Sequence, residues 1–337
     1  MVTIKDIAKI ANVSHTTVSR ALNDSPLIKP GTKKKIIEIA SQLNYTPNYN
    51  AKSLVKQKSY TIGLFLTSLT NGTSSSFFVE TVKGVNSVIT QHYNLFVKGI
   101  ENLDDYTTIH HKRFDGIILM SQSDHDDDFI AYLKEKKIPC VVLGRDIGDS
   151  TLLNIVSNDR EGSSQIVKYL IQQGHRDIAI VEGIKGFKSS MERREGYLNA
   201  LSDHHIPIKN EYIIQGNYDM ESGYLALEKL LTLERPPTAI FCSNDDMAIG
   251  AMNAAFAKGL TVPKDISIVG FDDIEFAQYT NPSLTTVKRP IEKISSLGAK
   301  KMLEMLEMDE NTELPGGKIY VETELVIRRS VSPFKST

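Results

Sequence analysis

Three short helical patterns follow one another near the start of the chain, and each has a recognisable beginning. Thr3, with Asp6 three residues later, has the spacing of a capping box. Ser14 can cap a second helix, and Pro30 suits the first turn of a third. Two helices joined by a tight turn, with a third helix to complete the core, form the helix-turn-helix plan. The pattern therefore predicts a small all-α domain over residues 1–46.

The second of these helices, expected over His15–Leu22, leaves a polar face free to enter a major groove. Arg20 on that face can make a bidentate contact to guanine. Residues 1–60 hold 10 Lys or Arg against 3 Asp or Glu, whereas the remaining 277 residues hold 29 against 38. An ordinary three-helix bundle with a solvated face does not explain this asymmetry, whereas a nucleic-acid-binding surface requires it. The sequence therefore predicts a DNA-binding head.

The motifs TIKDIAKIANVS-HTTVSRALN, LNYTPN and AKSL resemble the lactose-repressor (LacI/GalR) family of bacterial transcription regulators. The resemblance continues over nearly the whole chain. It implies that the residues after the capping serine read the operator. The residues expected to contact DNA are Thr3, Ser14, His15, Thr16, Thr17, Arg20, Asn23, Tyr45 and Leu54.

Residues 47–59 are expected to form a hinge helix and a linker. The hinge helix of the family resembles Pro47–Val55 of this chain, and its leucine, here Leu54, is inserted into the minor groove at the operator centre. An apolar wedge of this kind unstacks a base step and gains wider contact in return. The segment is too short to be a stable helix alone in water, so we expect it to order on DNA. Leu54 as an ordinary apolar residue of the linker is the alternative.

After the linker, short apolar runs alternate with amphipathic segments such as Glu161–Gln173 and Ser222–Leu231. Uninterrupted β-branched or apolar runs are typical of parallel strands that are covered on both faces, so the fold class is α/β. A natural division near Ser157 predicts two doubly wound parallel-sheet lobes. The runs are Thr61–Leu66, Asn94–Val97, Gly116–Met120, Cys140–Leu143, Ile178–Val181, Thr238–Cys242 and Ile266–Gly270.

The family resemblance implies a periplasmic-binding-protein-like core, over residues 60–337, that binds an effector and dimerises. Its two lobes would be joined by three crossing segments, near Ser157, Thr286–Lys288 and Lys318–Val321. The expected lobe boundaries are about 60–157 with 288–318 for the first lobe, and about 158–287 with 319–330 for the second. Ligands of parallel sheets bind beyond the carboxyl ends of the strands, which here places the effector between the lobes.

A sugar effector requires planar donors, carboxylates for paired hydroxyls and an aromatic face. Motifs at expected strand ends or helix starts supply this set, and the resemblance assigns Arg193, Asn244 and Asp272 to the pocket. Asp245 is equally explained as the cap of a helix that begins at Asp246, and Asp273 as a solvated residue. The expected effector-binding residues are Phe77, Phe78, Arg145, Arg193, Asn244 and Asp272.

Two departures from the family pattern bear on the ligand. The segment Lys98–Arg113 is shorter than the family leads us to expect, which puts any contact from it in doubt. The loop Asn71–Ser76 is longer, and together with Leu143-Gly144-Arg145 it is similar to maltose-type repressors, which favours an α-glucoside. Arg145 could equally pair with a neighbouring carboxylate.

No catalytic or cofactor motif stands out, and we expect no enzyme activity, no cofactor and no bound metal. The pairs His110-His111 and His204-His205 lack metal-ligand spacing, and Asp124–Asp128 is interpreted as the solvated, acidic start of a helix. Cys140 and Cys242 lie in apolar runs and are expected to be buried thiols rather than a disulfide. With no export signal and no membrane-spanning run, a cytoplasmic protein without membrane association is expected.

These observations predict a homodimeric repressor of a carbohydrate operon, which binds pseudo-palindromic double-stranded operator DNA and responds to a small effector. A solute-binding protein for a transporter is the first rival, and the basic head argues against it. A catabolite-control regulator with a phosphocarrier-protein corepressor is the second, although such regulators tend to lack the arginine found at Arg193. A purine-responsive repressor is the third.

Overall fold

The computed structural model describes residues 2–22, 25–43, 45, 58–70, 72–89, 93–309 and 314–334. The chain forms two compact units, Met1–Lys58 and Ser59–Thr337, here called the head and the core. The expected hinge helix with Leu54, and the expected DNA contact Asn23, lie outside the described residues. Along the described part of the chain, no helix is both long and apolar enough to cross a membrane.

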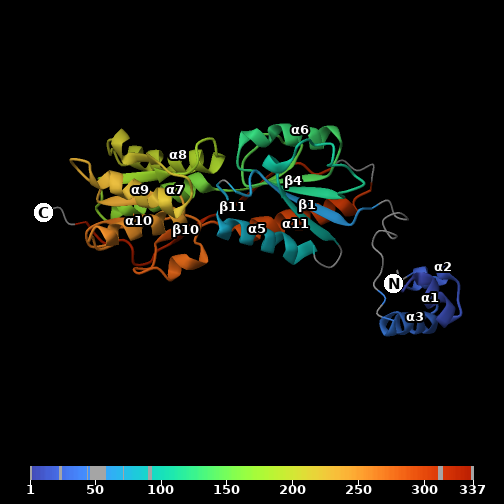
Figure 1. Ribbon diagram of the computed structural model, residues 1–337. Coiled ribbons are helices and arrows are strands. Elements are labelled where there is room, and N and C mark those ends of the chain that lie inside the picture. The colour runs from blue at the N-terminus through green and yellow to red at the C-terminus, as the bar shows by residue number, and fades with distance from the viewer. Residues whose placement is uncertain are drawn as a thin grey trace. The chain divides into compact units, whose positions relative to one another are not determined.

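The head consists of α1 (Ile4–Ala11), α2 (His15–Leu22) and α3 (Pro30–Gln42), coloured blue in Figure 1. All three helices begin where the sequence predicts, and Pro30 occupies the first turn of α3. The head core combines residues from all three helices, with Val13 and Leu22 packed at its edge. Ile37 of α3 does not contribute to this core, because its side chain is 48% exposed. The buried members are Ile7, Ala8, Ala11, Val18, Ala21, Ile36, Ile39 and Ala40.

The first lobe of the core is built on a six-stranded parallel sheet with the order β11-β5-β4-β3-β1-β2. Its strands are β1 (Thr61–Leu66), β2 (Asn94–Gly99), β3 (Gly116–Met120), β4 (Cys140–Leu143), β5 (Leu153–Ser157) and β11 (Gly317–Val321). One face packs against α5 (Ser75–Ile89) and α11 (Ile291–Glu307), and the other against α6 (Asp127–Glu135). Short 3-10 turns lie at Ile100–Asn102 and Asp124–Asp126.

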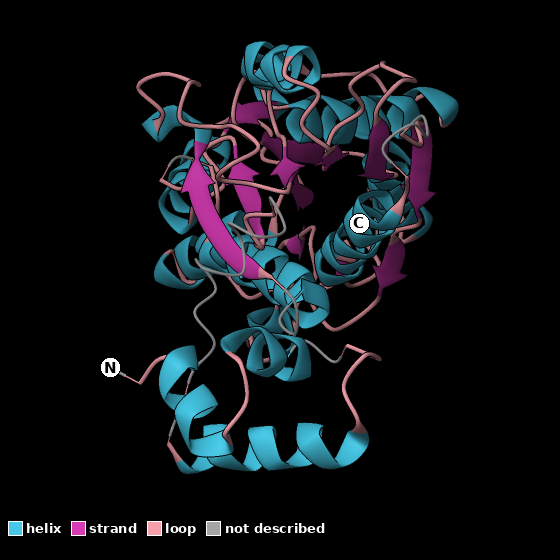
Figure 2. Ribbon diagram, turned by 90° about the vertical axis from the view of Figure 1, so that its right-hand side faces the viewer, coloured by secondary structure: helices cyan, strands magenta, loops and turns pink. Residues whose placement is uncertain are grey.

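The second lobe is built on a four-stranded parallel sheet with the order β7-β6-β8-β9. Its strands are β6 (Ile178–Glu182), β7 (Ile213–Gln215), β8 (Ala239–Cys242) and β9 (Ser267–Val269). One face is covered by α9 (Met220–Leu231) and α10 (Asp245–Ala257), and the other by α7 (Asp159–Gln172) and α8 (Lys188–Asp203). Figure 2 shows the strands of the core with helices around them. Turns at Asn210–Tyr212 and Glu275–Gln278 complete the lobe.

Three segments connect the lobes. The first runs from β5 directly into α7, and the second leads from β10 (Thr286–Lys288) into α11. The third leads from β11 to β12 (Glu324–Val326), which pairs antiparallel with β10. The boundary expected at residue 318 lies instead after Val321, because all of β11 pairs with β5 in the first lobe.

Two parallel sheets covered on both faces confirm the predicted fold class. Each of the seven predicted strands exists, with ends within a residue or two of the expected ones. Several short strands were not predicted from the sequence, among them β7 and β12, because three residues give no readable periodicity. Cys140 and Cys242 are free, buried thiols, as expected.

Candidate functional sites in the head and between the lobes

The polar face of α2 is the candidate DNA-reading surface of the head. Ser14 caps the helix, since its Oγ accepts a hydrogen bond from the Thr17 backbone N–H at 3.1 Å. Val18 and Ala21 turn into the core, which orients the opposite side of the helix outward. The exposed side chains on and before this helix are Ser14, His15, Thr16 and Arg20, with Thr17 and Ser19 half-buried.

The other expected DNA contacts in the head flank this helix in sequence. Thr3 is exposed, and its backbone N–H and its hydroxyl both donate to Asp6 Oδ2, at 2.9 and 2.7 Å. The predicted capping box is therefore present. Tyr45 is half-buried against the head core, and its N–H donates to the Ala40 carbonyl at 2.9 Å. Both residues are available at the surface, but each also holds the head together.

A cleft between the lobes is the second candidate site. At its centre is a small pocket of about 20 Å³, called here the central pocket. Larger pockets of about 510 and 640 Å³ adjoin it and share lining residues with it. The central pocket is lined by Gly72, Ser74, Phe77, Gln122, Ser189, Arg193, Tyr218, Asn244, Asp272 and Arg289.

Arg193 is the residue around which the central pocket is organised. It lies on α8, is 2% exposed, and its Nε donates to Asp159 Oδ2 at 3.0 Å. Its Nη2 reaches Asp272 Oδ1 at 3.0 Å, and its Nη1 donates to the Ser243 carbonyl. A buried guanidinium with two carboxylates and a carbonyl is fully paired, as a buried charge has to be.

Asp272 occupies an unusual backbone conformation beside Arg193. Its φ is 108°, in a region that residues with a side chain rarely adopt. Its N–H donates to the Val287 carbonyl at 2.8 Å, and its carbonyl accepts from the Arg289 N–H at 3.2 Å, so β10 holds the backbone in place. Burial raises the pKa of the Asp272 carboxyl, against the charges of Arg193 and Arg289, which lower it.

Asn244 serves both the fold and the pocket. Its Oδ1 accepts from the Met247 N–H at 2.9 Å, which makes it the N-cap of α10, and its Nδ2 donates to the Tyr218 carbonyl at 3.0 Å. The expectation that Asp245 caps a helix beginning at Asp246 is wrong, because α10 begins at Asp245 itself. The buried Asp245 carboxylate instead accepts from the Ile274 N–H and the Thr286 hydroxyl, at 2.9 and 2.5 Å.

Of the six residues expected to bind the effector, four line the central pocket, namely Phe77, Arg193, Asn244 and Asp272. Phe78 is packed against the first-lobe core and does not line it. Arg145 lines the adjoining 510 Å³ pocket, where its guanidinium is held by Ser121 at 2.7 Å, by Asp124 at 3.0 Å and by Asp127. Arg145 therefore pairs with neighbouring carboxylates, which is the alternative that the sequence left open for it.

Two acidic residues are not solvated, namely Asp126, for which this was expected, and Asp273, for which it was left open as an alternative. Asp126 is 1% exposed and accepts hydrogen bonds from the Thr67 and Ser121 hydroxyls, both at 2.6 Å. Asp273 pairs with Arg328 at 2.6 Å. Within the described residues, no group of three or more His, Cys, Asp or Glu side chains is arranged to hold a metal ion.

The sequence interpretation missed Ser189, Tyr218, Arg289 and Asp159. The Ser189 and Tyr218 hydroxyls share a hydrogen bond of 3.0 Å at the edge of the pocket. Arg289 lies just after β10 and Asp159 just after β5. Both positions follow strand ends, so the rule applied to the other pocket residues would have found them if these strands had been recognised.

The carboxylate of Glu80, on α5, is half-buried and lies within the electrostatic influence of acidic groups from both lobes. Burial and the charges of Asp272, Glu292 and Asp273 raise its pKa to about 7, while Lys83 acts in the opposite direction. The folded protein thus holds this proton more tightly than the unfolded chain does. The destabilisation of the fold by the charged carboxylate is absent below the ordinary pKa of a glutamate, grows as the pH rises from there to about 7, and is complete above it.

Glu80→Gln should therefore stabilise the protein at pH 8 and leave its stability unchanged at pH 4. The gain at pH 8 should be about 1 kcal/mol, because the half-buried carboxylate is partly screened by solvent. Melting temperatures of the variant and the parent across this pH range measure it. Glu135→Gln on the surface of α6 serves as the control. A difference in melting temperature that does not vary with pH would contradict the assignment.

Two protein-family models match the chain. The model of bacterial regulatory proteins of the lacI family matches residues 3–48, and that of the periplasmic binding protein-like domain matches residues 167–331. The chain is also 65% identical over 331 residues to the probable HTH-type transcriptional repressor ExuR of Bacillus subtilis (strain 168), with 98% of each chain covered. The chain belongs to the lacI family of bacterial regulatory proteins.

More distant members of the lacI family match over the same length. The HTH-type transcriptional repressor PurR of Actinobacillus pleuropneumoniae serotype 3 (strain JL03) is 35% identical over 337 residues, with 98% of each chain covered. Among solved structures, the lac repressor dimer bound to operator and the anti-inducer ONPF is 27% identical with a TM-score of 0.83, and 98% and 99% of the two chains are covered. A transcriptional regulator CelR–cellobiose complex is 26% identical with a TM-score of 0.73, and the match covers 98% of this chain and 100% of the other.

Membership of the lacI family confirms the resemblance seen in the sequence and makes the protein a DNA-binding transcriptional regulator. The family model of residues 3–48 coincides with the head, and the periplasmic-binding-protein-like model lies within the core. A solute-binding protein for a transporter does not require a DNA-binding head, so this alternative function is excluded.

Proposed function

We propose that the protein represses carbohydrate-utilisation genes as a homodimer on a pseudo-palindromic operator, under the control of a sugar-type effector in the central pocket. The observation that carries the proposal is the buried Arg193 with Asp272, Asn244 and Phe77 around one small polar pocket between the lobes. This set combines a planar donor, a carboxylate, an amide and an aromatic face, as a sugar requires. The relative that binds cellobiose and the operator-bound lac repressor dimer support it by similarity.

The central pocket is too small as it stands to enclose a sugar, because its volume of about 20 Å³ has room for about one water molecule, which needs roughly 10–15 Å³ by the same measure. An effector therefore has to displace pairings of Arg193 or change the angle between the lobes. It can change operator affinity only by as much as its affinities for the two lobe arrangements differ, which is typically about 1–3 kcal/mol. The head supplies the DNA contacts, with Arg20 as the base-reading residue.

A calorimetric screen of the full chain tests the effector class. Neutral sugars including α-glucosides, sugar acids, sugar phosphates and purine bases would be titrated, and each ligand that binds would be added to an operator complex followed by fluorescence anisotropy. Sugar acids are included because two arginines, Arg193 and Arg289, line the pocket. Binding by a carbohydrate that also changes operator affinity is the expected result.

A purine effector is the second candidate, because PurR proteins match at 35% and 36% identity and two aromatic residues, Phe77 and Tyr218, line the pocket. Binding of a purine base without binding of any carbohydrate would replace the sugar proposal. A response only to a phosphorylated carrier protein would favour the catabolite-control alternative instead.

A further inference from the structure

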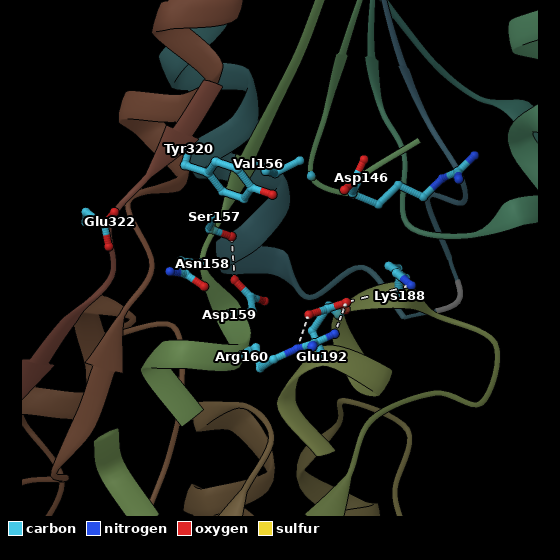
Figure 3. A pocket seen from close by; sticks show the side chains of 13 residues that line it. Asp146, Val156, Ser157, Asn158, Asp159, Arg160, Lys188, Glu192, Tyr320 and Glu322 are labelled. Atoms are coloured by element: carbon cyan, nitrogen blue, oxygen red, sulfur yellow. Dashed lines mark hydrogen bonds and ion pairs between the residues drawn. The ribbon is translucent and has the colours of Figure 1, made fainter. Parts of the chain in front are cut away.

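Asp159 is buried between the crossing segments and the central pocket. It is the first residue of α7, at the end of the first crossing, and its side chain is 4% exposed. Its Oδ2 is 3.0 Å from both Nε and Nη2 of Arg193, and its Oδ1 is 3.3 Å from Nε of Arg289. The Ser157 hydroxyl donates to the same carboxylate, as Figure 3 shows. One carboxylate thus holds two guanidinium groups.

The side chains of both arginines extend from Asp159 to the central pocket and form part of its lining. Nη2 of Arg193 also pairs with Oδ1 of Asp272, at 3.0 Å. The Arg289 guanidinium, 6% exposed, lies 5.7 Å from the centre of the Phe77 ring. Asp159 itself lines the neighbouring 510 Å³ pocket and not the central one, so it stands behind the two arginines as seen from the central pocket.

The group that holds the arginines is also joined to the crossing segments. Arg289 belongs to the second crossing, and it donates to Ser157 of the first crossing at 2.9 Å and to the Gly144 carbonyl of the first lobe at 3.4 Å. Next to Asp159, the Asn158 N–H donates to the carbonyl of Val321, where the third crossing begins, at 3.3 Å. All three crossings therefore meet within one bonded cluster.

We propose that Asp159 is the positioning residue of the effector pocket, which holds Arg193 and Arg289 toward the ligand and joins them to the segments that set the angle between the lobes. This inference rests on the proposed effector site and adds Arg289 to its ligand-contacting residues. An effector that takes up donors of either arginine competes with Asp159 for them. The rearrangement is then transmitted to the crossings, because Asp159, Ser157 and Arg289 are part of them.

Charge balance explains why a carboxylate is needed at this position. Two buried arginines face two aspartates, the buried Asp159 and the largely buried Asp272, so the charges of these four side chains cancel. Burial alone would raise the pKa of Asp159, but the charges of Arg289 and Arg193 outweigh it and keep the pKa below its ordinary value. An uncharged residue at position 159 would leave two guanidinium groups to share Asp272, and they would repel each other.

The test measures the angle between the lobes and requires no ligand. Spin labels would be attached to Ala131→Cys on α6 of the first lobe and Ser202→Cys on α8 of the second, both exposed positions. Cys140 and Cys242 should stay unlabelled, because they are buried and burial raises the pKa of both thiols. Distances between the labels in the full chain would be measured by double electron–electron resonance. Asp159→Asn should give a broader distribution with a second population that the parent lacks.

Two further variants separate positioning from packing. Arg289→Gln in the Asp159→Asn background restores the charge balance, so the double variant should give a narrower distance distribution than Asp159→Asn alone. If the two substitutions only disturbed packing, the distribution of the double variant would be broader still. Asp146→Asn, which loses only a surface pairing with Lys318, is the matched control and should match the parent. If Asp159→Asn does not fold, the comparison is made between the double variant and Arg289→Gln alone, and the double variant should be the narrower of the two.

An unchanged distance distribution in folded Asp159→Asn would overturn the inference, whatever the effector is. A distance distribution that is broader in the double variant than in the single variant with which it is compared would also overturn it. Failure of every sugar to bind in the calorimetric screen would instead overturn the proposed function, and the distance measurement would still decide whether Asp159 holds the lobes.

Discussion

Arg193→Ala is expected to abolish the change in operator affinity that the effector causes, while operator binding without effector persists. The guanidinium is the central donor of the pocket, and the head folds as a unit separate from the core that carries it. The variant should also lose about 3 kcal/mol of stability, because the buried Asp159 loses one of its two cationic partners and the largely buried Asp272 is left without Arg193. Fluorescence anisotropy with labelled operator, at a temperature where the variant is folded, measures both affinities.

Two variants make this result specific. Arg193→Lys retains the charge but loses the planar fork, so it should keep most of the stability and still lose most of the response. Arg194→Ala removes the neighbouring, half-exposed arginine, which pairs with Glu182 at 2.7 Å outside the pocket, and should behave like the parent. If folded Arg193→Lys responds normally, the role of Arg193 is structural and the effector binds elsewhere in the cleft.

Arg20→Ala is expected to weaken binding to the true operator by about 1–3 kcal/mol and to relax discrimination at one base pair. This corresponds to roughly a fivefold to 150-fold loss of affinity. The reason is the position of Arg20 on the outward face of α2, opposite the buried Val18 and Ala21. Binding at fixed salt to matched operators and to operators with single base changes would measure both effects.

The control for Arg20 is a cation of the head that lies outside α2. Lys34→Ala on α3 removes an exposed charge, so any loss should be small and the same on every sequence, as for a contact to phosphate. Equal weakening of Arg20→Ala on all operators would assign Arg20 to the backbone of the DNA rather than to a base.

The helices of the head and the longer apolar strands of the core follow from strong local signals. Caps at Thr3 and Ser14 and a proline at the start of α3 fix the helix starts, because each satisfies backbone groups that the helix leaves unpaired. Long apolar runs such as Gly116–Met120 are readable because a strand buried on both faces cannot tolerate polar residues. These features depend on residues that are close together in the chain, so a single sequence is enough to predict them.

The ionic cluster of the cleft is of a different kind. Asp159 and Arg289 are 130 positions apart in sequence and meet because two crossing segments run side by side. No local pattern distinguishes such a pair from surface charges. The short strands β10 and β12 that align the crossings are also too short to be predicted. Arg193, Asn244 and Asp272 could be proposed only because they follow recognisable strands or match a family motif.

The three crossings also have a consequence for the order in which the protein is made. The first lobe contains α11 and β11, which the ribosome supplies only after the four-stranded sheet of the second lobe has been synthesised. Until then, the face of the first sheet that α11 covers, near Leu143 and Ile118, stays open to solvent. The nascent chain thus carries an apolar surface through most of translation, a state prone to aggregation. Because the first lobe lacks α11 and β11 until then, chains that terminate within the second-lobe sheet should be held by chaperones or degraded rather than accumulate as a folded half.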